Sequence, residues 1–321
     1  MLPSALEADQ VLADLRAAGV EAARSEGSAS PQRGTLPDAG EAQDEQQRHA
    51  QELQSFQALQ RFQDTLKQGG LDLLQPFELD CLGKSKIALP GLSSYRPTQL
   101  GVVIGNTSAL WPAFLRHLRG LGVRSAAELG PDPLDIYVEE LIQGALTDLL
   151  EGSAIRGTAA YGHERLPTPI PIQRIAEVAG LARIGPAHLS VHSRFGPWFA
   201  LRAVALLSVP ADVGAVFASR PSAAHPCDGC DAPCRRALSG ALLHRDVDLA
   251  TPGPPAPPGL SERQQRWLKV RDACPIGAEH RYSAAQILYH YDGQREVLLG
   301  EAKQLDDPAR GGKARARKPR P

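Results

Sequence analysis

A short apolar run at residues 100–105, Leu-Gly-Val-Val-Ile-Gly, most strongly limits how this chain can fold. The run lies between polar flanks, which predicts one buried strand of a sheet. Further strands are predicted at residues 188–192 and 198–209, with a hairpin turn between them at 194–197. The fold must therefore contain a sheet, and the segments before and after this run must bury its faces.

Helix signals alternate with these strands. Asp132 followed by Pro133 predicts a helix that begins there and runs to about residue 150. Ser261 with Gln264 predicts a capping box, and a helix after it. Because helices and strands are interspersed and at least one hairpin is expected, an α+β fold is favoured over a regular βαβ series.

Composition shifts predict three parts in the 321 residues. Residues 1–46 are poor in large apolar side chains and are predicted to be largely disordered. Residues 47–300 are predicted to form the folded domain, which opens with a helical apolar stripe that ends at Gly69-Gly70. Residues 301–321 end in a basic run, which predicts a disordered, solvated tail.

The charge balance excludes several classes of protein. Lys and Arg number 35 against 36 Asp and Glu, a net charge of -1, so a dedicated nucleic-acid binder is not expected. No apolar run reaches the roughly 20 residues of a membrane span. The first residues lack a secretory signal, so a cytoplasmic protein is expected. The chain also lacks the phosphate loop, the dinucleotide fingerprint, the nucleophile elbow and the His-Glu-x-x-His zinc motif.

Four of the five cysteines fall late in the chain, at Cys227, Cys230, Cys234 and Cys274. A pair of cysteines two residues apart can face one soft metal, and a later Cys-Pro pair is typical of iron–sulfur ligation. Three interpretations stay open: a 4Fe–4S cluster, a structural zinc ion in which His225 or His280 replaces a ligand, and free thiols.

An aromatic and arginine cluster occupies residues 188–202. Trp198 and Arg202 are four residues apart, so on a strand they would share a face. The simpler alternative is a core strand whose arginine extends its head group to water.

Residues 191–202, Val-His-Ser-Arg-Phe-Gly-Pro-Trp-Phe-Ala-Leu-Arg, resemble the central motif of the cblC-type cobalamin-processing family, the cyanocobalamin reductases and alkylcobalamin dealkylases. Residues 271–283 and 294–300 resemble later motifs of that family in the same order. The resemblance implies a nitroreductase-like antiparallel sheet flanked by helices. It also implies removal of the upper axial ligand of base-off cobalamin, by glutathione-dependent dealkylation or by reductive decyanation with FAD or FMN. Downstream cobalamin-accepting proteins would be partners.

The same resemblance implies roles for particular residues, although it implies no certain catalytic residue. Three arginines are implied for glutathione, whose two carboxylates suit planar guanidinium groups: Arg202, Arg271 and Arg295. Five residues are implied for cobalamin: His163, Gln173, Phe195, Trp198 and Phe199. No Asp-x-His-x-x-Gly motif is present to replace the lower axial base of cobalamin.

Two alternatives remain for the function. The cysteines, together with Cys274-Pro275, resemble features of iron–sulfur corrinoid enzymes of the epoxyqueuosine reductase type, in which a cluster would donate electrons to the corrin. A non-catalytic cobalamin carrier would have the same pocket without turnover.

Overall fold

The computed structural model describes residues 39–304, apart from 90–93, 97–98, 152, 165–168, 211–212, 215–216, 218–224 and 244–253. Most of the predicted segment 1–46 and most of the predicted tail 301–321 lie outside the described residues.

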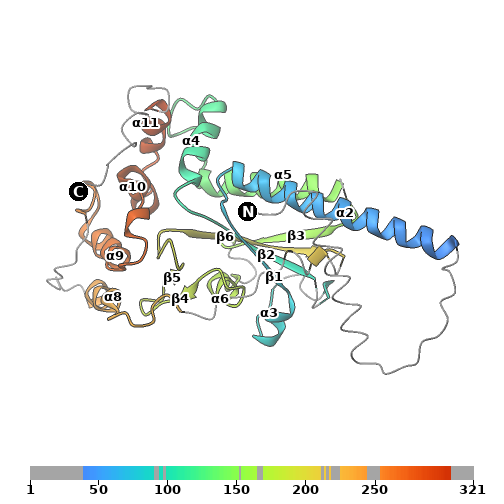
Figure 1. Ribbon diagram of the computed structural model, residues 1–321. Coiled ribbons are helices and arrows are strands. Elements are labelled where there is room, and N and C mark those ends of the chain that lie inside the picture. Colours follow the sequence, from blue (N-terminus) through green and yellow to red (C-terminus); the bar gives the residue numbers. More distant parts are fainter. Residues whose placement is uncertain are drawn as a thin grey trace, which may run out of the picture.

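A four-stranded antiparallel sheet with the strand order β1-β2-β6-β3 forms the centre of the molecule (Figure 1). Its strands are β1 (Leu73–Glu78), β2 (Leu100–Asn106), β6 (Ala200–Ser208) and β3 (Arg156–Tyr161). Every residue of β2 is buried, which confirms the strand predicted from its apolar run. The α+β class is confirmed as well.

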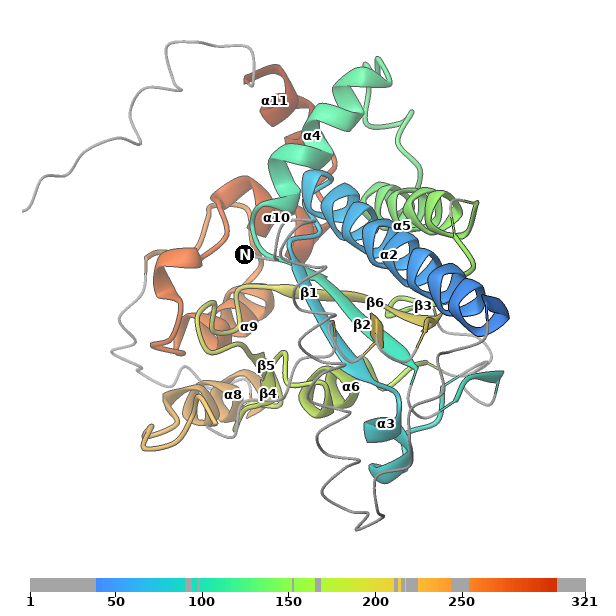
Figure 2. The ribbon, with the colours of Figure 1, turned by 45° about the vertical axis from the view of Figure 1, so that its right-hand side comes forward.

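Helices cover both faces of the sheet (Figures 1 and 2). One face is covered by α2 (Ala39–Gln68) and α5 (Pro133–Glu151), and the other by α3 (Asp80–Lys84) and α6 (Ile172–Val178). Each layer closes its own apolar core against the sheet. The helix α2 begins inside the segment predicted to be disordered, and it ends before Gly69-Gly70 as predicted.

A group of helices lies beyond one end of the strands, and all but one of them come from the chain after β6 (Figure 1). These elements are α4 (Leu110–Gly120), which comes earlier in the chain, and then α8 (Pro233–Leu243), α9 (Glu262–Asp272), η2 (Ala278–His280), α10 (Ala284–Asp292) and α11 (Glu296–Gln304). The predicted capping box of Ser261 and Gln264 opens α9. Within this group α8 packs on α9, and α11 packs on both α10 and α4.

The predicted hairpin at residues 188–209 is wrong. The strand β5 (Ser190–Val191) pairs with β4 (Arg183–Ile184), whereas β6 joins the large sheet. Only a single bridge between His192 and Gly196 closes the predicted turn. Strands this short leave no alternating pattern from which their pairing could be read.

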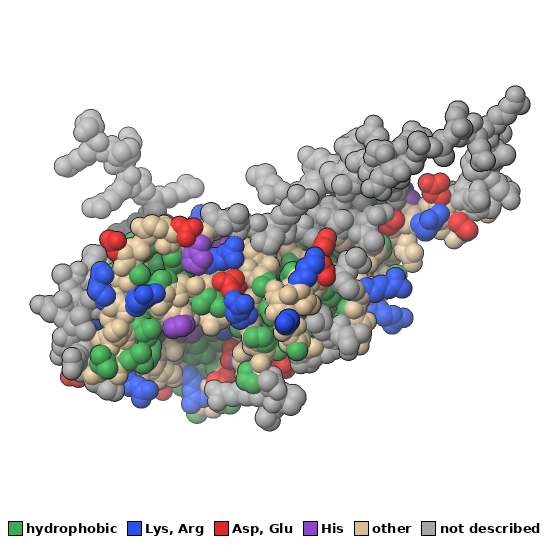
Figure 3. Space-filling view, turned by 90° about the horizontal axis from the view of Figure 1, so that it is seen from below, with side chains coloured by type: hydrophobic (Ala, Val, Ile, Leu, Met, Phe, Trp, Pro, Cys, Tyr) green, Lys and Arg blue, Asp and Glu red, His purple; other side chains and the backbone are tan. Residues whose placement is uncertain are grey.

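One face of the described part is mixed in charge. Seen from below, basic and acidic side chains are interspersed with hydrophobic ones (Figure 3). None of the described helices is both long enough and apolar enough to cross a membrane.

Candidate functional site

A β-bulge in β6 aims Arg202 at helix α5. Ile104 of β2 pairs with Ala203, but the next residue, Gly105, pairs with Leu201. Arg202 is therefore the extra residue of the bulge, and the two-residue alternation of β6 is interrupted there. Leu201 consequently packs on the α6 side of the sheet, while Ala203 packs on the α5 side.

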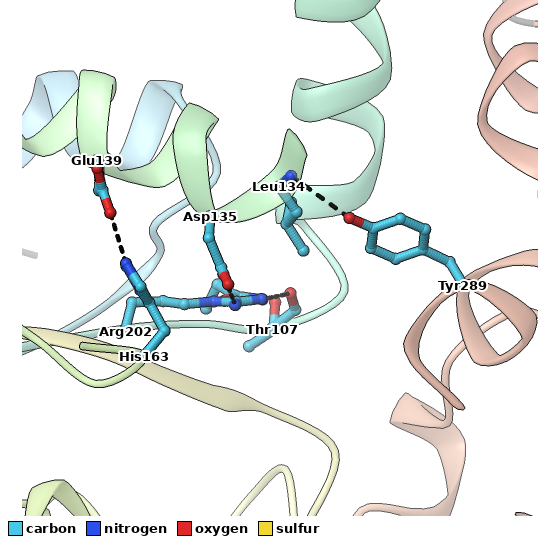
Figure 4. A network of polar contacts seen from close by, with 8 residues as sticks. Thr107, Leu134, Asp135, Glu139, His163, Arg202 and Tyr289 are labelled. Carbon is cyan, nitrogen blue, oxygen red and sulfur yellow. Dashed lines mark hydrogen bonds and ion pairs between the residues drawn. The ribbon is translucent and has the colours of Figure 1, made fainter. Parts of the chain in front are cut away.

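The prediction that Trp198 and Arg202 share one strand face is wrong, because only Arg202 belongs to the strand. Trp198 precedes β6, which begins at Ala200, and it is fully buried in a separate cluster with Tyr282 and residues of the C-terminal helices. The Arg202 side chain points toward Asp135 on α5 (Figure 4).

Two polar groups hold the Arg202 guanidinium (Figure 4). Its Nε donates a hydrogen bond of 2.7 Å to Oδ1 of the buried Asn106, and its Nη1 lies 3.3 Å from Oδ1 of Asp135. Burial lowers the pKa of Arg202, and the nearby Asp135 opposes that shift. An arginine does not lose its proton in proteins, so this end of the sheet carries a fixed, largely buried positive charge.

A polar pocket of about 700 Å³, partly open to solvent, lies in front of Arg202. We call it the arginine pocket; its walls are formed by Pro131, Asp132, Leu134, Asp135, Arg202, Tyr289, His290, Gly293 and Arg295. Arg295 reaches it from the residue before α11, and its Nη1 donates hydrogen bonds to the carbonyl oxygens of Leu129 and Gly130. The structure thus brings Arg202 and Arg295, far apart in the chain, to one pocket.

Two neutral ring groups complete this pocket. Burial, followed by the charges of Arg202 and Arg271, lowers the pKa of His290 to about 3. Burial also raises the pKa of Tyr289 to about 12. Both rings are therefore uncharged near neutral pH, and they leave the two arginines and two aspartates as the charges of the pocket.

Arg271 lies outside the arginine pocket. Its Nη2 donates a hydrogen bond to the carbonyl oxygen of Pro197, and its guanidinium carbon lies 4.5 Å from the ring centre of Trp198 and 4.9 Å from that of Tyr282. These cation–π contacts place the guanidinium over two buried rings. The three arginines implied for glutathione are thus divided between two places.

Arg271 lines a second pocket of about 610 Å³, which is more open. We call it the Gln173 pocket; its other walls are Ile172, Gln173, Leu189, Ser190, Pro197, Phe199 and Leu201. It contains two of the residues implied for cobalamin, Gln173 and Phe199. The Gln173 side chain donates to the carbonyl oxygen of His188, which fixes the start of α6 against the β4–β5 hairpin.

The other three residues implied for cobalamin do not line this pocket. Trp198 lies beneath Arg271. Phe195 packs on the rings of His192 and His280. His163 lies beside α5, with its Nε2 2.5 Å from Oε1 of Glu139 (Figure 4).

All four late cysteines line one small pocket, part of which is open to solvent. We call it the cysteine pocket; its walls are Cys227, Cys230, Cys234 and Cys274, with Gly185, Pro186, Ala187, Leu189, Val191, Pro197, Ala232, Pro275 and Ile276. Neither His225 nor His280 is among them. Within the described residues, no three His, Cys, Asp or Glu side chains are placed to hold a single metal ion.

The thiols of this pocket lie near one another; Cys274 is buried and the other three cysteines are partly buried. Burial raises the pKa of Cys227, Cys234 and Cys274, that of Cys274 to about 11, and the neighbouring thiols add to each shift. The fifth cysteine, Cys81, lies on α3 in another part of the molecule.

The three pockets adjoin one another. Leu189 and Pro197 line both the cysteine pocket and the Gln173 pocket. Leu201 lines the Gln173 pocket, and the next residue, Arg202, lines the arginine pocket. The start of β6 therefore lines two of the three pockets, and the cysteine pocket meets the Gln173 pocket at Leu189 and Pro197.

Sequence reasoning missed Asn106, which holds Arg202, and two residues that line the arginine pocket. Asn106 is a buried amide at the end of β2, directly after the apolar run, and this position was the available signal. Tyr289 and His290 lie on a helix with no distinctive motif, so nothing in the sequence marked them.

No family model matches the sequence, and no curated protein matches it. Among solved structures, the chain is similar to the crystal structure of a B12-trafficking protein CblC from C. elegans, described as a homologue of human MMACHC. The two share 15% sequence identity, with a TM-score of 0.49 over 76% of this chain and 96% of that chain.

Proposed function

We propose that this protein binds a corrinoid over the Gln173 pocket and removes its upper alkyl ligand with a carboxylate-bearing thiol, such as glutathione, held in the arginine pocket. The observation that carries the proposal is the bulge at Arg202. It turns consecutive residues, Leu201 and Arg202, toward the two pockets, and Arg271 of the Gln173 pocket lies near enough to His290 of the arginine pocket for its charge to lower the pKa of that histidine.

The arginine pocket suits an anionic thiol. Guanidinium groups bind carboxylates with two parallel hydrogen bonds, and Arg295 and Arg202 present theirs from different walls. The positive charge of both also favours the thiolate over the neutral thiol. The peptide-like body of such a thiol would find donors and acceptors at Asp132 and Tyr289.

In the proposed reaction the thiolate sulfur attacks the alkyl carbon bonded to cobalt. A carbon–sulfur bond forms, the cobalt–carbon bond breaks, and both of its electrons stay on the metal, so cobalt(III) becomes cobalt(I) and a thioether is released. The protein contributes position and electrostatics, since the corrinoid carries the difficult chemistry. Holding the two reactants together can lower the activation free energy by several kcal/mol.

Mixing the protein with methylcobalamin tests the proposal. We expect the absorption spectrum to shift to the base-off form, and added glutathione to yield S-methylglutathione, detected by mass spectrometry. The variant Gln173→Trp, which fills the pocket rim, should lose the shift, whereas Arg174→Trp, its exposed neighbour on α6, should keep it. An unshifted spectrum with saturating wild-type protein would exclude the corrinoid site.

A second function is favoured by the cysteine pocket, which shares Leu189 and Pro197 with the Gln173 pocket. In this alternative the protein is a corrinoid-dependent reductase, and its electrons reach the corrin through metal bound by the thiols. Dealkylation by glutathione alone, in the absence of any reductant, distinguishes the first function from the second.

A further inference from the structure

Four thiols from two separate segments meet in the cysteine pocket. Cys227, Cys230 and Cys234 lie on the loop before α8 and on its first turn, while Cys274 follows the end of α9. The helices α8 and α9 pack on each other, which brings these segments together (Figures 1 and 2). Apart from the sulfurs the walls are apolar, and they leave almost no empty space. A reaction among the thiols themselves therefore fits this pocket better than a bulky ligand does.

Cys234 is the thiol that the others have in common. Burial raises the pKa of Cys274 and of Cys227, and among the neighbouring thiols Cys234 contributes most to both shifts. Cys234 also packs on the small apolar cluster that contains Ala273, the residue before Cys274. Cys234 and Cys274 are therefore neighbours in space, although a long stretch of chain separates them.

The two thiols differ in their surroundings. Cys234 is partly exposed and lies in the first turn of α8, where its sulfur accepts hydrogen bonds from the amides of Arg235 and Ala187. These amides oppose the burial that raises the pKa of Cys234, and the positive end of the helix also favours a thiolate. Cys274 is buried, and burial raises its pKa to about 11. Cys234 is therefore placed to react first with a disulfide from solution, and Cys274 to react with the product.

A disulfide between these two residues suits the pocket. The bond is uncharged, adds no atoms, and requires only two sulfurs whose Cα atoms lie about 4.4–6.8 Å apart. A tetrahedral metal ion instead requires three or four ligands around one point, and the described ranges contain no such group. Burial disfavours the thiolates of the pair, so the pair lacks the stabilised reduced form that makes some disulfides strong oxidants. A small disulfide can therefore oxidise it.

We propose that Cys234 and Cys274 form a reversible disulfide by exchange with a small-molecule disulfide such as glutathione disulfide. The Cys234 thiolate attacks one sulfur of the small disulfide, so that a mixed disulfide forms and one small thiolate leaves. Cys274 then gives up its proton and attacks Sγ of Cys234, and the second small thiolate leaves. Two electrons pass from the protein to the small disulfide, which departs as two thiols that carry the protons of the cysteines.

The bond fastens α8 to the segment that carries Arg271. The amide of Cys274 donates a hydrogen bond of 3.1 Å to the carbonyl oxygen of Arg271, and Arg271 donates to the carbonyl oxygen of Pro197. Pro197 is a wall of both the cysteine pocket and the Gln173 pocket. Closing a long loop also restricts the unfolded chain. Oxidation should therefore stiffen this wall of the Gln173 pocket and stabilise the packing of α8 on α9.

The test uses the full chain, reduced with dithiothreitol, desalted without oxygen, and mixed with glutathione disulfide at mildly alkaline pH. Wild type should lose the mass of two hydrogens and release two molecules of glutathione per chain. After the free thiols are alkylated, trypsin cleaves after Arg235 and Arg271 and so separates the two cysteines. Mass spectrometry should then find the peptides that contain Cys234 and Cys274 linked, and dithiothreitol should restore both thiols.

Three variants identify the pair. The double variant Cys227→Ser, Cys230→Ser keeps only the proposed pair in the pocket, and it should oxidise as wild type does. Cys274→Ser should instead stop at the mixed disulfide, with the mass of one glutathione on Cys234. Cys81→Ser removes the cysteine on α3 and should behave as wild type.

Wild type that keeps all five thiols free in glutathione disulfide overturns the proposal, whether or not the variants fold. A bond confined to Cys227 and Cys230 overturns it as well, and so does a double variant that has the circular dichroism of wild type but does not oxidise. Thiols that react only after a chelator is added would be bound to metal, and this result also overturns the proposal.

Hydrogen exchange measures the fastening of α8 separately. Amides of residues 270–277 should exchange more slowly in the oxidised protein than in the reduced protein. Amides of β1, which contributes no wall to the cysteine pocket, should exchange equally in both. Equal rates at residues 270–277 overturn the fastening and leave the disulfide standing.

Discussion

Arg202 and Asp135 form an ion pair that joins the bulged start of β6 to the first turn of α5. The closest charged atoms are 3.3 Å apart, and the side chains are 12% and 29% exposed. The aspartate compensates a buried guanidinium and also complements the positive end of the helix. The pair therefore fixes the arginine that the proposed thiol must meet.

Asp135→Asn removes this compensation and leaves the guanidinium charge partly buried. We expect a loss of about 1–3 kcal/mol in the free energy of unfolding, measured by urea denaturation. Asp148→Asn, at an exposed position of the same helix, should change it by no more than about 0.5 kcal/mol. Equal free energies of unfolding for wild type and Asp135→Asn would show that the ion pair does not stabilise the fold.

Arg295→Gln tests the arginine pocket with little risk to the fold, because its present partners are two backbone carbonyls. Loss of one charged hydrogen-bonding partner costs about 1.5–3 kcal/mol, which corresponds to roughly a 10- to 150-fold rise in the KM for glutathione. Cobalamin affinity should stay within about twofold. Arg174→Gln, which is remote from the pocket, serves as the control. An unchanged KM in Arg295→Gln would assign the arginine a structural role only.

His290 should make the protein sensitive to acid. Burial depresses its folded-state pKa to about 3, whereas in the unfolded chain the ring titrates near its model value of 6.5. Between these values the unfolded state binds a proton that the folded state does not. The neutral His290 therefore makes its full contribution to the free energy of unfolding above pH 6.5. Below that pH the free energy of unfolding falls by up to about 1.4 kcal/mol for each pH unit, until the pH reaches about 3.

Urea denaturation of wild type and His290→Phe at pH 7, 6, 5 and 4 measures this effect. The ring contacts with Trp111, Tyr282 and Tyr289 favour phenylalanine as the replacement. The variant should show a smaller slope of stability against pH than wild type. Parallel slopes in the two proteins would mean that His290 does not link folding to pH.

Gly196→Ala should push the segment around Ile276 away from the segment around Gly196, because the two are in direct contact at this glycine. A Cβ there would lie 1.8 Å from the carbonyl oxygen of Ile276, and Gly196 also has a φ of 54°. We expect destabilisation well above the roughly 1 kcal/mol of a left-handed residue alone, together with a displaced Cys274 segment. Gly122→Ala provides the matched control, since its φ is 69° but nothing lies within 4 Å. Similar thermal midpoints for the two variants would show that the close approach carries no cost.

Local signals in the sequence predicted much of the fold. The apolar run of β2, the proline at the start of α5 and the capping box of α9 each act within a few residues, and the structure has all three elements. The pairing of β4 with β5 was not predictable, because two-residue strands have no periodicity and their partners are set by tertiary contacts.

In the site, too, the features set by local sequence were predictable and those set by tertiary contacts were not. The spacing of Cys227, Cys230 and Cys234 predicted that these thiols act together, and the Cys274-Pro275 pair suggested the fourth. The direction of Arg202 was not predictable, because it depends on the register between β6 and β2. Grouping Arg271 with the other arginines followed from resemblance alone, and stacking on Trp198 places it elsewhere.

The order of the strands along the chain has a consequence for synthesis. All four strands of the large sheet are complete by Ser208, and the cysteine-pocket thiols begin only at Cys227. On the ribosome, where N-terminal parts of a chain fold first, the sheet with α2, α5 and α6 can therefore form before any of these four thiols emerges. A chain whose cysteine segments fail to pack would then still produce a folded sheet.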